Sequence, residues 1–488
     1  MPSSVNPIPY GVQFLQKMSN KFPNLGAIYN RMSIFKYSVL VLTFITYAAY
    51  HASRKPISVV KNVLYQNCSL IHPSANDTNP DWCNWEPFTA VNHTTLFGTL
   101  DSAFLFSYAI AMFFSGLIAE HVNIRLFLTT GMILSGVACS MFGLAYYYDI
   151  HSMYYFIAIQ VFGGICQTTG WPGVVTAMGN WFGKGNRGFI FGIWNSHTSI
   201  GNIIGTLMAS WYVESNWGLS FIVPGLFIII SGICIFLFLV VHPSDIMIDT
   251  SEKTQNGGHK DEVKERTEGS PILSSLDDSS HKAVGFLGAI KIPGVVEFSM
   301  CLFFAKLVSY TFLYWLPNYI KASTSYSASQ SADLSTLFDV GGIFGGIAAG
   351  IFSDMYGKSA CTCAVMLFLA IPSLYAYNLL ASINLYFSIG LLLTVGGLVN
   401  GPYALITTAV SAELGTHDCL KGNAKALATV TSIIDGTGSI GAAVGPLLAA
   451  YTSDMFGWTS VFYMLMASNV LAIVLLTRLV KRELQNVG

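Results

Sequence analysis

Two positively charged side chains stand inside stretches of the sequence that are otherwise apolar. Arg54 belongs to YAAYHASRKP, residues 47–56, and Lys306 lies about midway along a later apolar stretch. An ionised side chain at the centre of a bilayer costs at least about 2.5–3.5 kcal/mol, so each one calls for a partner or a purpose. A guanidinium is a planar fork that matches phosphate or carboxylate, and lysine adds a compact second charge. We therefore predict an anion site built from Arg54 and Lys306.

Phosphate is the anion that suits this pair best. Two positive groups match about two negative charges, which a phosphate monoester carries at neutral pH because its second pKa is about 6. An empty site would have to close over two unneutralised cations, whereas bound phosphate would cancel their charge. The same electrostatics predicts that the loaded protein reorients and the empty one does so slowly, which is exchange of one anion for another.

Further charges in apolar stretches have predicted partners or roles of their own. Lys55 points about 100° round the helix from Arg54, and we expect it to form an ion pair with Asp339. Asp435 is a further candidate, either as a charged group of the site or as a cap on a helix end. The neighbouring sequence GTGSIG favours a locally irregular backbone there.

The elements that position these residues are predicted to be membrane-spanning helices. The chain of 488 residues is 53% hydrophobic and 10% charged, and its mean hydropathy is +0.55, which is typical of a membrane protein. Its net charge of −1 argues against a nucleic-acid partner. Apolar stretches long enough to cross about 30 Å of hydrocarbon lie at 36–60, 95–119, 125–147, 153–178, 188–212, 217–241, 292–320, 331–353, 359–378, 382–409, 424–450 and 458–479. The sequence thus predicts an all-α membrane protein with twelve transmembrane helices.

The distribution of Lys and Arg predicts how the bundle is oriented, because short loops rich in them stay in the cytosol. Most Lys and Arg residues outside the spans lie before the first span, in or beside even-numbered loops, or in the tail. They are Lys17, Lys21, Arg31, Lys36, Arg125, Lys184, Arg187, Lys358, Lys421, Lys425, Lys481 and Arg482. The opposite loops hold only Lys61 and Lys321. We therefore expect a cytosolic N-terminal segment, 1–35, and a cytosolic tail, 481–488.

The loop at 62–94 has the features of a lumenal segment. It holds the N-x-[ST] glycosylation sequons at Asn67, Asn76 and Asn92. An oxidising lumen would also permit a disulfide between Cys68 and Cys83, whereas the other cysteines read as small apolar packing residues.

A polar segment at 243–286, rich in Ser and Gly, is predicted to be a cytosolic linker between two halves, 36–242 and 287–480. The halves are related, because TSIGNIIGTLMASW from Thr198 aligns with GSIGAAVGPLLAAY from Gly438 at a constant offset of 240 residues. A repeat of six spans in the same orientation predicts two parallel bundles related by an axis along the membrane normal.

A loop of the second half resembles the G-x-x-x-D-x-x-G-[RK] motif of the major facilitator superfamily. The matching residues are Gly350, Asp354, Gly357 and Lys358, and the first-half counterpart is altered, with Glu120 for the acid. The resemblance implies the major facilitator fold of two six-helix bundles. It also implies that Asp354 and Lys358 help to latch the bundles on the cytosolic side.

Longer runs are similar to the organophosphate:phosphate antiporter family, and most similar to its eukaryotic sugar-phosphate exchangers. They include YAAYHASRKPIS, QTTGWPGVV, KLVSYTFLYWLPNYI and KGNAKALATVTSIIDGTGSIGAAVGPLLAA. The resemblance implies an antiporter of the endoplasmic reticulum membrane that exchanges a sugar phosphate such as glucose 6-phosphate for inorganic phosphate. The family pattern Y-x-x-Y-x-x-x-R-K matches Tyr47, Tyr50, Arg54 and Lys55, which implies that Arg54 holds the phosphate and that Lys55 pairs with Asp339.

The sequence departs from the family at three positions, one of which is Met112, where the bacterial branch has a second-helix lysine. The bacterial branch has a seventh-helix arginine where Ser309 stands here, and Lys306 lies one helical turn, about 4.5 Å, before it. The fifth-helix signature R-G-x5-W-N-x-x-H has Thr198 at its histidine position, and His197 comes one residue early.

The sugar end of the ligand would need polar partners from helices that line the cavity. We expect these from Tyr47, Tyr50, Asn195, Thr198 and Tyr403, and we count His197 and Lys55 as further candidate contacts of the substrate.

Two other functions are compatible with the sequence. One is a proton-coupled carrier of organic anions, with Asp339 or Asp435 as the proton site, and the other is a membrane scaffold that does not transport and recruits partners through its linker. No cofactor loop, metal cluster or catalytic set stands out, so the sequence predicts no enzyme activity. It leaves the preferred sugar phosphate and the oligomeric state open.

Overall fold

The computed structural model describes residues 7–21, 31–65, 85–89, 92–119, 121–182, 193–246, 286–415 and 424–485 of the chain. The predicted sequons at Asn67 and Asn76, the predicted disulfide between Cys68 and Cys83, and most of the predicted linker lie outside these ranges. The third sequon, Asn92, immediately precedes a helix.

The described residues of the first half form helices and loops only. The helices are α1 (Tyr10–Lys21), α2 (Arg31–Arg54), α3 (Pro56–Leu64), α4 (His93–Ala119), α5 (Ile124–Tyr147), α6 (Met153–Gln167), α7 (Gly170–Trp181), α9 (His197–Val213) and α10 (Trp217–Phe238). Since α2 with α3, and α6 with α7, each make one interrupted rod, six rods follow the short helix α1.

The second half repeats this plan with six more rods. Its elements are α12 (Phe286–Ile290), α13 (Val295–Ser323), α14 (Ala328–Tyr356), α15 (Ser359–Leu380), α16 (Leu385–Leu405), the π-helical turn η3 (Ile406–Val410), α17 (Ser411–Gly415), α18 (Ala424–Phe456) and α19 (Trp458–Gln485). Ten of the twelve rods are long and apolar enough to cross a membrane. The other two are the interrupted rod α6–α7 and α9, of which 17 residues are described.

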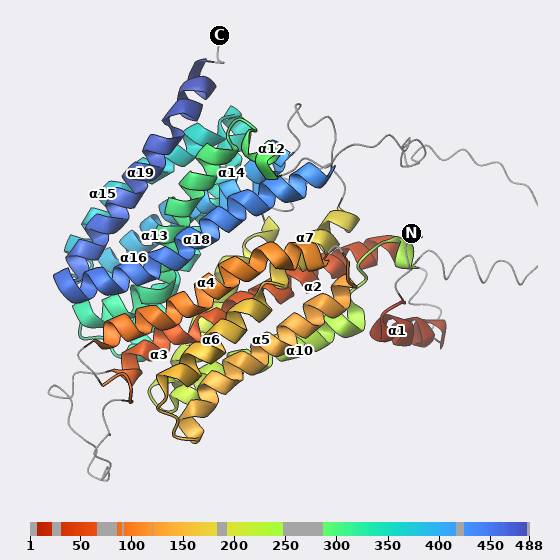
Figure 1. Cartoon of the computed structure of the whole chain (residues 1–488), viewed down its shortest axis with the longest axis horizontal. Helices are drawn as coiled ribbons and strands as arrows, with labels where there is room; N and C mark the ends of the chain where they lie inside the picture. Colours follow the sequence, from red (N-terminus) through yellow and green to blue (C-terminus); the bar gives the residue numbers. More distant parts are fainter. Residues whose placement is uncertain are drawn as a thin grey trace, which may run out of the picture.

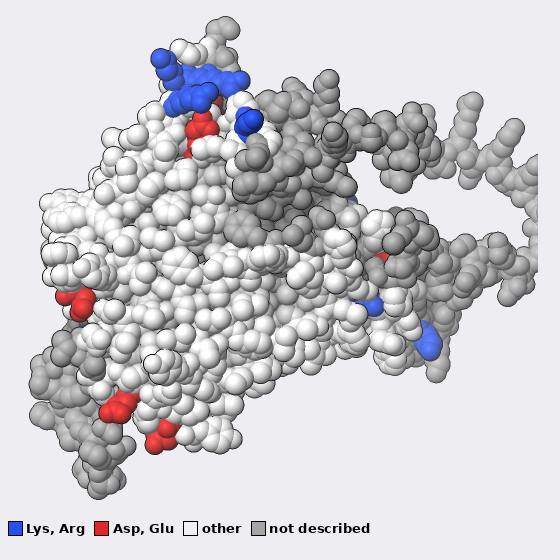
Figure 2. All heavy atoms as spheres, in the orientation of Figure 1, with Lys and Arg blue, Asp and Glu red and all other residues white. Residues whose placement is uncertain are grey.

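The rods form two bundles, one from each half, that lean against each other (Figure 1). We call the end where α2 begins and α19 ends the terminal side, and the opposite end, where α3 ends and α4 begins, the distal side. Lys and Arg gather at the end of α19 and near α1, while the lateral face between the two ends is almost free of charge (Figure 2). An uncharged belt between polar ends is the surface that a bilayer requires.

The internal repeat is visible in how glycines pack. A side chain on Gly201 or Gly205 of α9 would collide with the carbonyl oxygens of Ala48 and Ala52 on α2. The positions 240 residues later, Gly441 and Gly445 of α18, meet carbonyl oxygens of α13 in the same way. Each half therefore uses the same glycine pair to bring its fifth rod against its first.

Hydrogen bonds between the halves occupy the middle and the distal side. On the distal side, Ser210 Oγ of α9 donates to Asp333 Oδ1 of α14 over 2.6 Å. The carboxylate of Glu214 accepts the backbone N–H of Ser329 over 3.0 Å. Burial alone would raise the pKa of Glu214, but the Ser327 hydroxyl, this N–H and Lys321 together hold that pKa below its ordinary value. The distal ends are thus closed by polar contacts.

The sequence predicted that Lys61 and Lys321 lie in loops, but the structure places both of them in helices. Lys61 belongs to α3, is fully buried, and forms an ion pair of 2.5 Å with Asp101 of α4. Its ammonium also donates to the carbonyl oxygen of Tyr314 on α13 over 3.2 Å and stands 4.0 Å from the ring centroid of Trp315. Counting charges along the sequence could not show this, because the first rod extends further than its apolar stretch.

Candidate functional site

The first rod is interrupted at the residues that the sequence singled out. Proline has no N–H to continue the hydrogen-bond ladder, so α2 ends at Arg54 and α3 begins at Pro56, with Lys55 between them. The interruption places two cations side by side at mid-bundle. Pro56 was a visible signal for this break, which the apolar pattern alone concealed.

Arg54 is buried, with 5% of its surface exposed, among neutral partners. Its Nε donates to Gln167 Oε1 over 2.5 Å, and its guanidinium carbon stands 4.7 Å from the ring centroid of Tyr108. Gln167 is the last residue of α6, and its amide in turn donates to Ser53 Oγ over 2.8 Å. Within the described ranges, no carboxylate lies within 4.0 Å of Arg54. An anion would supply the missing countercharge.

Lys306, the second predicted cation, already has a partner. Its Nζ lies 2.7 Å from Asp435 Oδ1 on α18, and 17% of the Asp435 side chain is exposed. The expectation of two unneutralised cations in the empty site is therefore wrong for this structure, which leaves only Arg54 unpaired. The pairing depends on how α13 and α18 are rotated against each other, which spacing along the chain does not reveal.

Tyrosines connect Arg54 with the Lys306–Asp435 pair. Tyr108 of α4 lies close enough to interact electrostatically with both cations and with Asp435. Tyr310 of α13 is likewise within electrostatic reach of both cations. Arg54 and Lys306 thus lie within electrostatic reach of the same two tyrosines, and that they share one anion site stays a prediction. Sequence reasoning missed both tyrosines, although a phenol in an apolar span was a signal.

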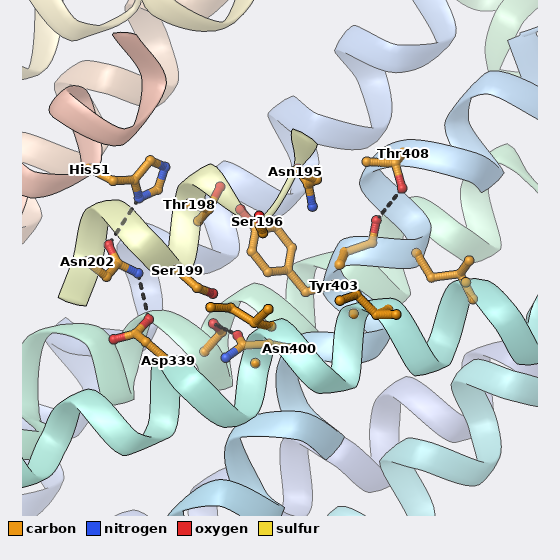
Figure 3. A pocket seen from close by; sticks show the side chains of 18 of the residues that line it. His51, Asn195, Ser196, Thr198, Ser199, Asn202, Asp339, Asn400, Tyr403 and Thr408 are labelled. Atoms are coloured by element: carbon orange, nitrogen blue, oxygen red, sulfur yellow. Dashed lines mark hydrogen bonds between the residues drawn. The ribbon is translucent and has the colours of Figure 1, made fainter. Parts of the chain in front are cut away.

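A cleft of about 100 Å³ runs between the bundles beside this region (Figure 3). Its polar lining comes from α2, from α9 and the turn before it, and from α13, α14, α16 and η3. These residues are His51, Asn195, Ser196, Thr198, Ser199, Asn202, Ser309, Tyr310, Asp339, Asp354, Asn400, Tyr403 and Thr408. Three predicted contacts, Asn195, Thr198 and Tyr403, lie on the cleft. The amides Asn202 and Asn400 were not predicted, and Asn400 Oδ1 accepts from Ser309 Oγ over 2.6 Å.

A chain of polar contacts crosses the cleft and joins the two halves. His51 Nδ1 lies 3.2 Å from Asn202 Oδ1, and Asn202 Nδ2 donates to Asp339 Oδ1 over 2.8 Å (Figure 3). The other oxygen of Asp339 is 4.0 Å from Lys55 Nζ, so the structure brings together the ion pair that the sequence proposed. Lys55 Nζ also donates to the carbonyl oxygen of Leu313 over 3.1 Å. Pro317 frees that carbonyl, since it lacks the N–H that would bond four residues back.

The other six predicted substrate contacts do not line the cleft; they are Arg54, Lys55, Lys306, Tyr47, Tyr50 and His197. His197 is fully buried, and its ring packs against those of Tyr47 and Trp194 at centroid distances of 4.6 and 4.4 Å. The single-residue offset from the family's histidine position turns it about 100° away, and Thr198 faces the cleft instead. Tyr50 is also buried, with its hydroxyl 2.7 Å from Thr169 Oγ1.

The predicted latch residues lie on the terminal side. Asp354 lines the terminal end of the cleft. Gly357 ends α14 with φ of +61°, a backbone conformation that favours glycine, and Lys358 precedes α15. No ion pair within 4.0 Å joins Asp354 to Lys358. In the part of the chain described, no group of three or more His, Cys, Asp or Glu side chains could hold a metal ion.

Comparison with known proteins places these features in a family. The family model of the Major Facilitator Superfamily matches residues 85–418 and 298–487. The glucose-6-phosphate exchanger SLC37A2 of Danio rerio is 54% identical over 469 residues, covering 94% of both chains. The human protein of that name is 53% identical over 472 residues and covers 93% of this chain and 94% of its own. The human glucose-6-phosphate exchanger SLC37A1 is 45% identical over 530 residues, with coverage of 99% and 97%.

Solved structures of the same fold are more distant in sequence. The crystal structure of a bacterial homolog to the human lysosomal transporter Spinster, in its inward-facing and unoccupied conformation, is 15% identical, with a TM-score of 0.60. The match covers 92% of this chain and 96% of that one.

Proposed function

Because this chain belongs to the major facilitator superfamily, and within it to the organophosphate:phosphate antiporters, we propose that it exchanges inorganic phosphate for a sugar phosphate of the glucose 6-phosphate kind. The observation that carries the proposal is Arg54, a buried guanidinium at a helix break that has neutral partners and, among the residues the structure describes, no carboxylate within 4.0 Å. A buried cation without a countercharge is costly. A phosphate would remove that cost each time it binds.

The charges around the cleft determine how the phosphate is held. Lys55 and Lys306 have Asp339 and Asp435 as partners, which leaves one net positive charge, on Arg54, in this region. The first negative charge of a phosphate neutralises Arg54. A second charge competes with Asp435 for Lys306, in a place that water reaches. Inorganic phosphate and the phosphate group of a sugar phosphate would both bind to Arg54. One ligand must therefore leave before the other binds.

The cleft supports the sugar half of the proposal. Its lining of amides and hydroxyls, among them Asn195, Asn202 and Asn400, offers both donors and acceptors for sugar hydroxyls. Tyr310 belongs to the cleft and also lies within reach of Arg54 and Lys306. A sugar phosphate would therefore lie with its phosphate toward the cations and its ring in the cleft.

Alternating access requires the closed distal side to open while the terminal side closes. We infer that the terminal side, with its excess of Lys and Arg, faces the cytosol and that the loop with the sequons faces the lumen of the endoplasmic reticulum. Labelling an added N-terminal epitope in cells, with only the plasma membrane opened, tests this orientation. Access of antibody to the epitope before the internal membranes are opened supports it, and access only afterwards contradicts it.

Reconstitution into liposomes tests the transport reaction itself. Radiolabelled phosphate should enter liposomes loaded with phosphate or glucose 6-phosphate, and should not enter empty ones. Uptake into empty liposomes driven by a pH gradient would instead favour a proton-coupled carrier of organic anions.

Variants of Arg54 connect the reaction to the site. Arg54→Ala removes charge-assisted hydrogen bonds worth about 3 kcal/mol in all, so phosphate exchange should fall about 100-fold. Arg54→Lys keeps the charge but loses the planar fork and the bond to Gln167, and should recover only part of the rate. The matched control is Arg478→Ala, since 82% of the Arg478 side chain is exposed on α19. Exchange at the normal rate in Arg54→Ala would remove this residue from the site.

A further inference from the structure

The outer face of the first bundle carries a groove of about 640 Å³ between α4, α5 and α6. Exposed apolar side chains border it, with exposed fractions of 62% for Ile110, 62% for Phe114 and 48% for Ile165. They continue the uncharged belt of the molecule, so the neighbour that the groove meets is the bilayer.

The groove exists because the fourth rod is interrupted. α6 ends at Gln167 and α7 begins at Gly170, and the connecting residues Thr168 and Thr169 form the inner wall of the groove. The interruption faces the groove on its outer side and Arg54 on its inner side. On its inner face Gln167 accepts from Arg54, and the hydroxyl of Thr169 meets that of Tyr50.

The groove offers almost no hydrogen bonds to a ligand. Ser107 donates to the carbonyl oxygen of Phe104, and Thr168 to that of Ile165. Ser115 of α4 donates across to the carbonyl oxygen of Thr168 over 2.8 Å, and Thr169 to that of Cys166 over 3.1 Å. Thr130 is the remaining hydroxyl of the lining, and it lies on the exposed side of α5. A sugar, a headgroup or a peptide would lose its hydrogen bonds with water here and gain none, so the groove selects an apolar ligand.

The length of the groove matches one layer of the bilayer. Its wall on α4 extends from Ser107 to Ile118, which is 11 residues or about 16 Å along the helix axis. Half of a hydrocarbon core of about 30 Å is about 15 Å. The groove therefore reaches from the terminal side of the bilayer to the middle, where the rod is interrupted.

We propose that this groove binds one acyl chain of a phospholipid from the leaflet on the terminal side, and that the bound chain supports the α6–α7 interruption that positions Arg54. The chain would support the interruption by close packing, because a filled groove keeps Thr168 and Thr169 from moving outward with Gln167. The binding site stands whether or not the proposed exchange reaction is correct, and only its effect on Arg54 rests on that reaction.

Photo-crosslinking tests the binding site without any transport assay. The full chain is reconstituted with phosphatidylcholine that carries a diazirine near the end of an acyl chain, and adducts are mapped by mass spectrometry after irradiation. Adducts at Phe114 and Leu134 should exceed those at Phe344 several-fold, although Phe344 of the same belt on α14 is more exposed, at 68% against 62% and 37%. Equal yields at all three would mean ordinary lipid contact and would overturn the proposal.

Filling the groove should displace the chain. Ala111→Phe puts a ring into the groove from α4 and should lower adducts at Leu134 to the level of Phe344. Ala111→Leu is a milder second variant, to be used if the first does not fold. The matched control is Ala364→Phe on α15, which lies beside exposed Val365 outside the groove and should leave the adducts unchanged. Undiminished groove adducts in both Ala111 variants would overturn the site.

Exchange kinetics then test the effect on Arg54. With an active wild-type protein, Ala111→Phe should raise the KM for phosphate about three- to fivefold, while Ala364→Phe should not. A normal KM in a variant that has lost the groove adducts would overturn the support of Arg54 and leave the acyl-chain site standing.

Discussion

At the scale of single residues, the intramembrane lysines differ in whether the carboxylate that each one pairs with belongs to the same bundle or to the other one. Lys61 and Asp101 both belong to the first bundle, so their ion pair can move as a unit, whereas the bond from Lys61 to the carbonyl oxygen of Tyr314 crosses to the second bundle. Lys55 and Asp339 belong to different bundles, so any separation of the bundles at this level strains their contact. Lys306 and Asp435 belong to the same bundle, and Lys306 Nζ stands 5.5 Å from the ring centroid of Tyr403, which lines the cleft. We propose that Asp435 holds Lys306 in place of a substrate phosphate when the site is empty.

Asp435→Asn should release Lys306 from this competitor. We expect the KM for phosphate to fall about fivefold, which corresponds to about 1 kcal/mol, in the liposome exchange assay. Asp454→Asn, on the same helix but exposed at the distal end, is the control and should leave the KM unchanged. A KM that stays constant or rises in Asp435→Asn would contradict the competition.

Lys61→Met should destabilise the protein strongly, because it leaves Asp101 buried without a countercharge. Removing one partner of a buried pair costs about 3–5 kcal/mol. Replacing both, as in Lys61→Met with Asp101→Leu, should return the melting temperature close to the normal value, since apolar substitutes for a buried pair are often neutral. Thermal unfolding in detergent measures both, and equal losses in the single and double variants would contradict this account.

At the scale of the elements, two interrupted rods meet at the site. Pro56 interrupts the first rod, and the interruption of the fourth at Thr168 and Thr169 lies opposite to it. Arg54 and Gln167 are the last residues of α2 and α6 and face each other across the gap. Helix ends leave main-chain groups without intrahelical partners, so polar side chains gather there. The site is therefore built where regular helices stop.

Gly131→Ala should disturb the α6–α7 interruption from the side of α5. An added Cβ on Gly131 of α5 would collide with Thr169 Oγ1, so Thr169 would have to move and weaken its contact with Tyr50. Overpacking of this kind costs about 1–3 kcal/mol. We expect a lower melting temperature together with a raised KM for phosphate. Gly116→Ala, where the added Cβ would meet no atom within 4 Å, should change neither, and the same effect in both variants would contradict the local explanation.

At the scale of the whole molecule, the bundles are closed on the distal side and hold a cleft between them nearer the terminal side. Ser210 with Asp333, and Asn318 with Asn62, bond across the closed end. Alternating access predicts that these contacts break in every cycle.

A disulfide between Ser210→Cys and Asp333→Cys should stop exchange by holding the distal side closed. The native side chains meet at 2.6 Å, which favours the short Cα separation that a disulfide needs. Oxidation should abolish phosphate exchange and reduction should restore it, while each single cysteine variant should exchange normally in both conditions. Full exchange in the cross-linked protein would contradict the opening of this end.

Features that depend on local composition could be predicted from the order of the residues. Apolar length predicted the twelve rods, and the repeat predicted two related bundles. The rarity of charge in apolar spans singled out Arg54, Lys55 and Lys306, and the family pattern pointed to the pair of Lys55 with Asp339. Each of these features can be predicted from a short segment of the sequence or from a pattern that recurs along it.

Which side chains face each other could be learned only once the helices were packed together. It paired Lys306 with Asp435 and Lys61 with Asp101, turned His197 away from the cleft and brought Asn202 and Asn400 onto it. The physical reason is rotation, because successive residues of a helix point about 100° apart and a small turn of one rod exchanges its partners. The direction a residue faces is set by the packing of all the rods together, so its position along the chain does not determine it.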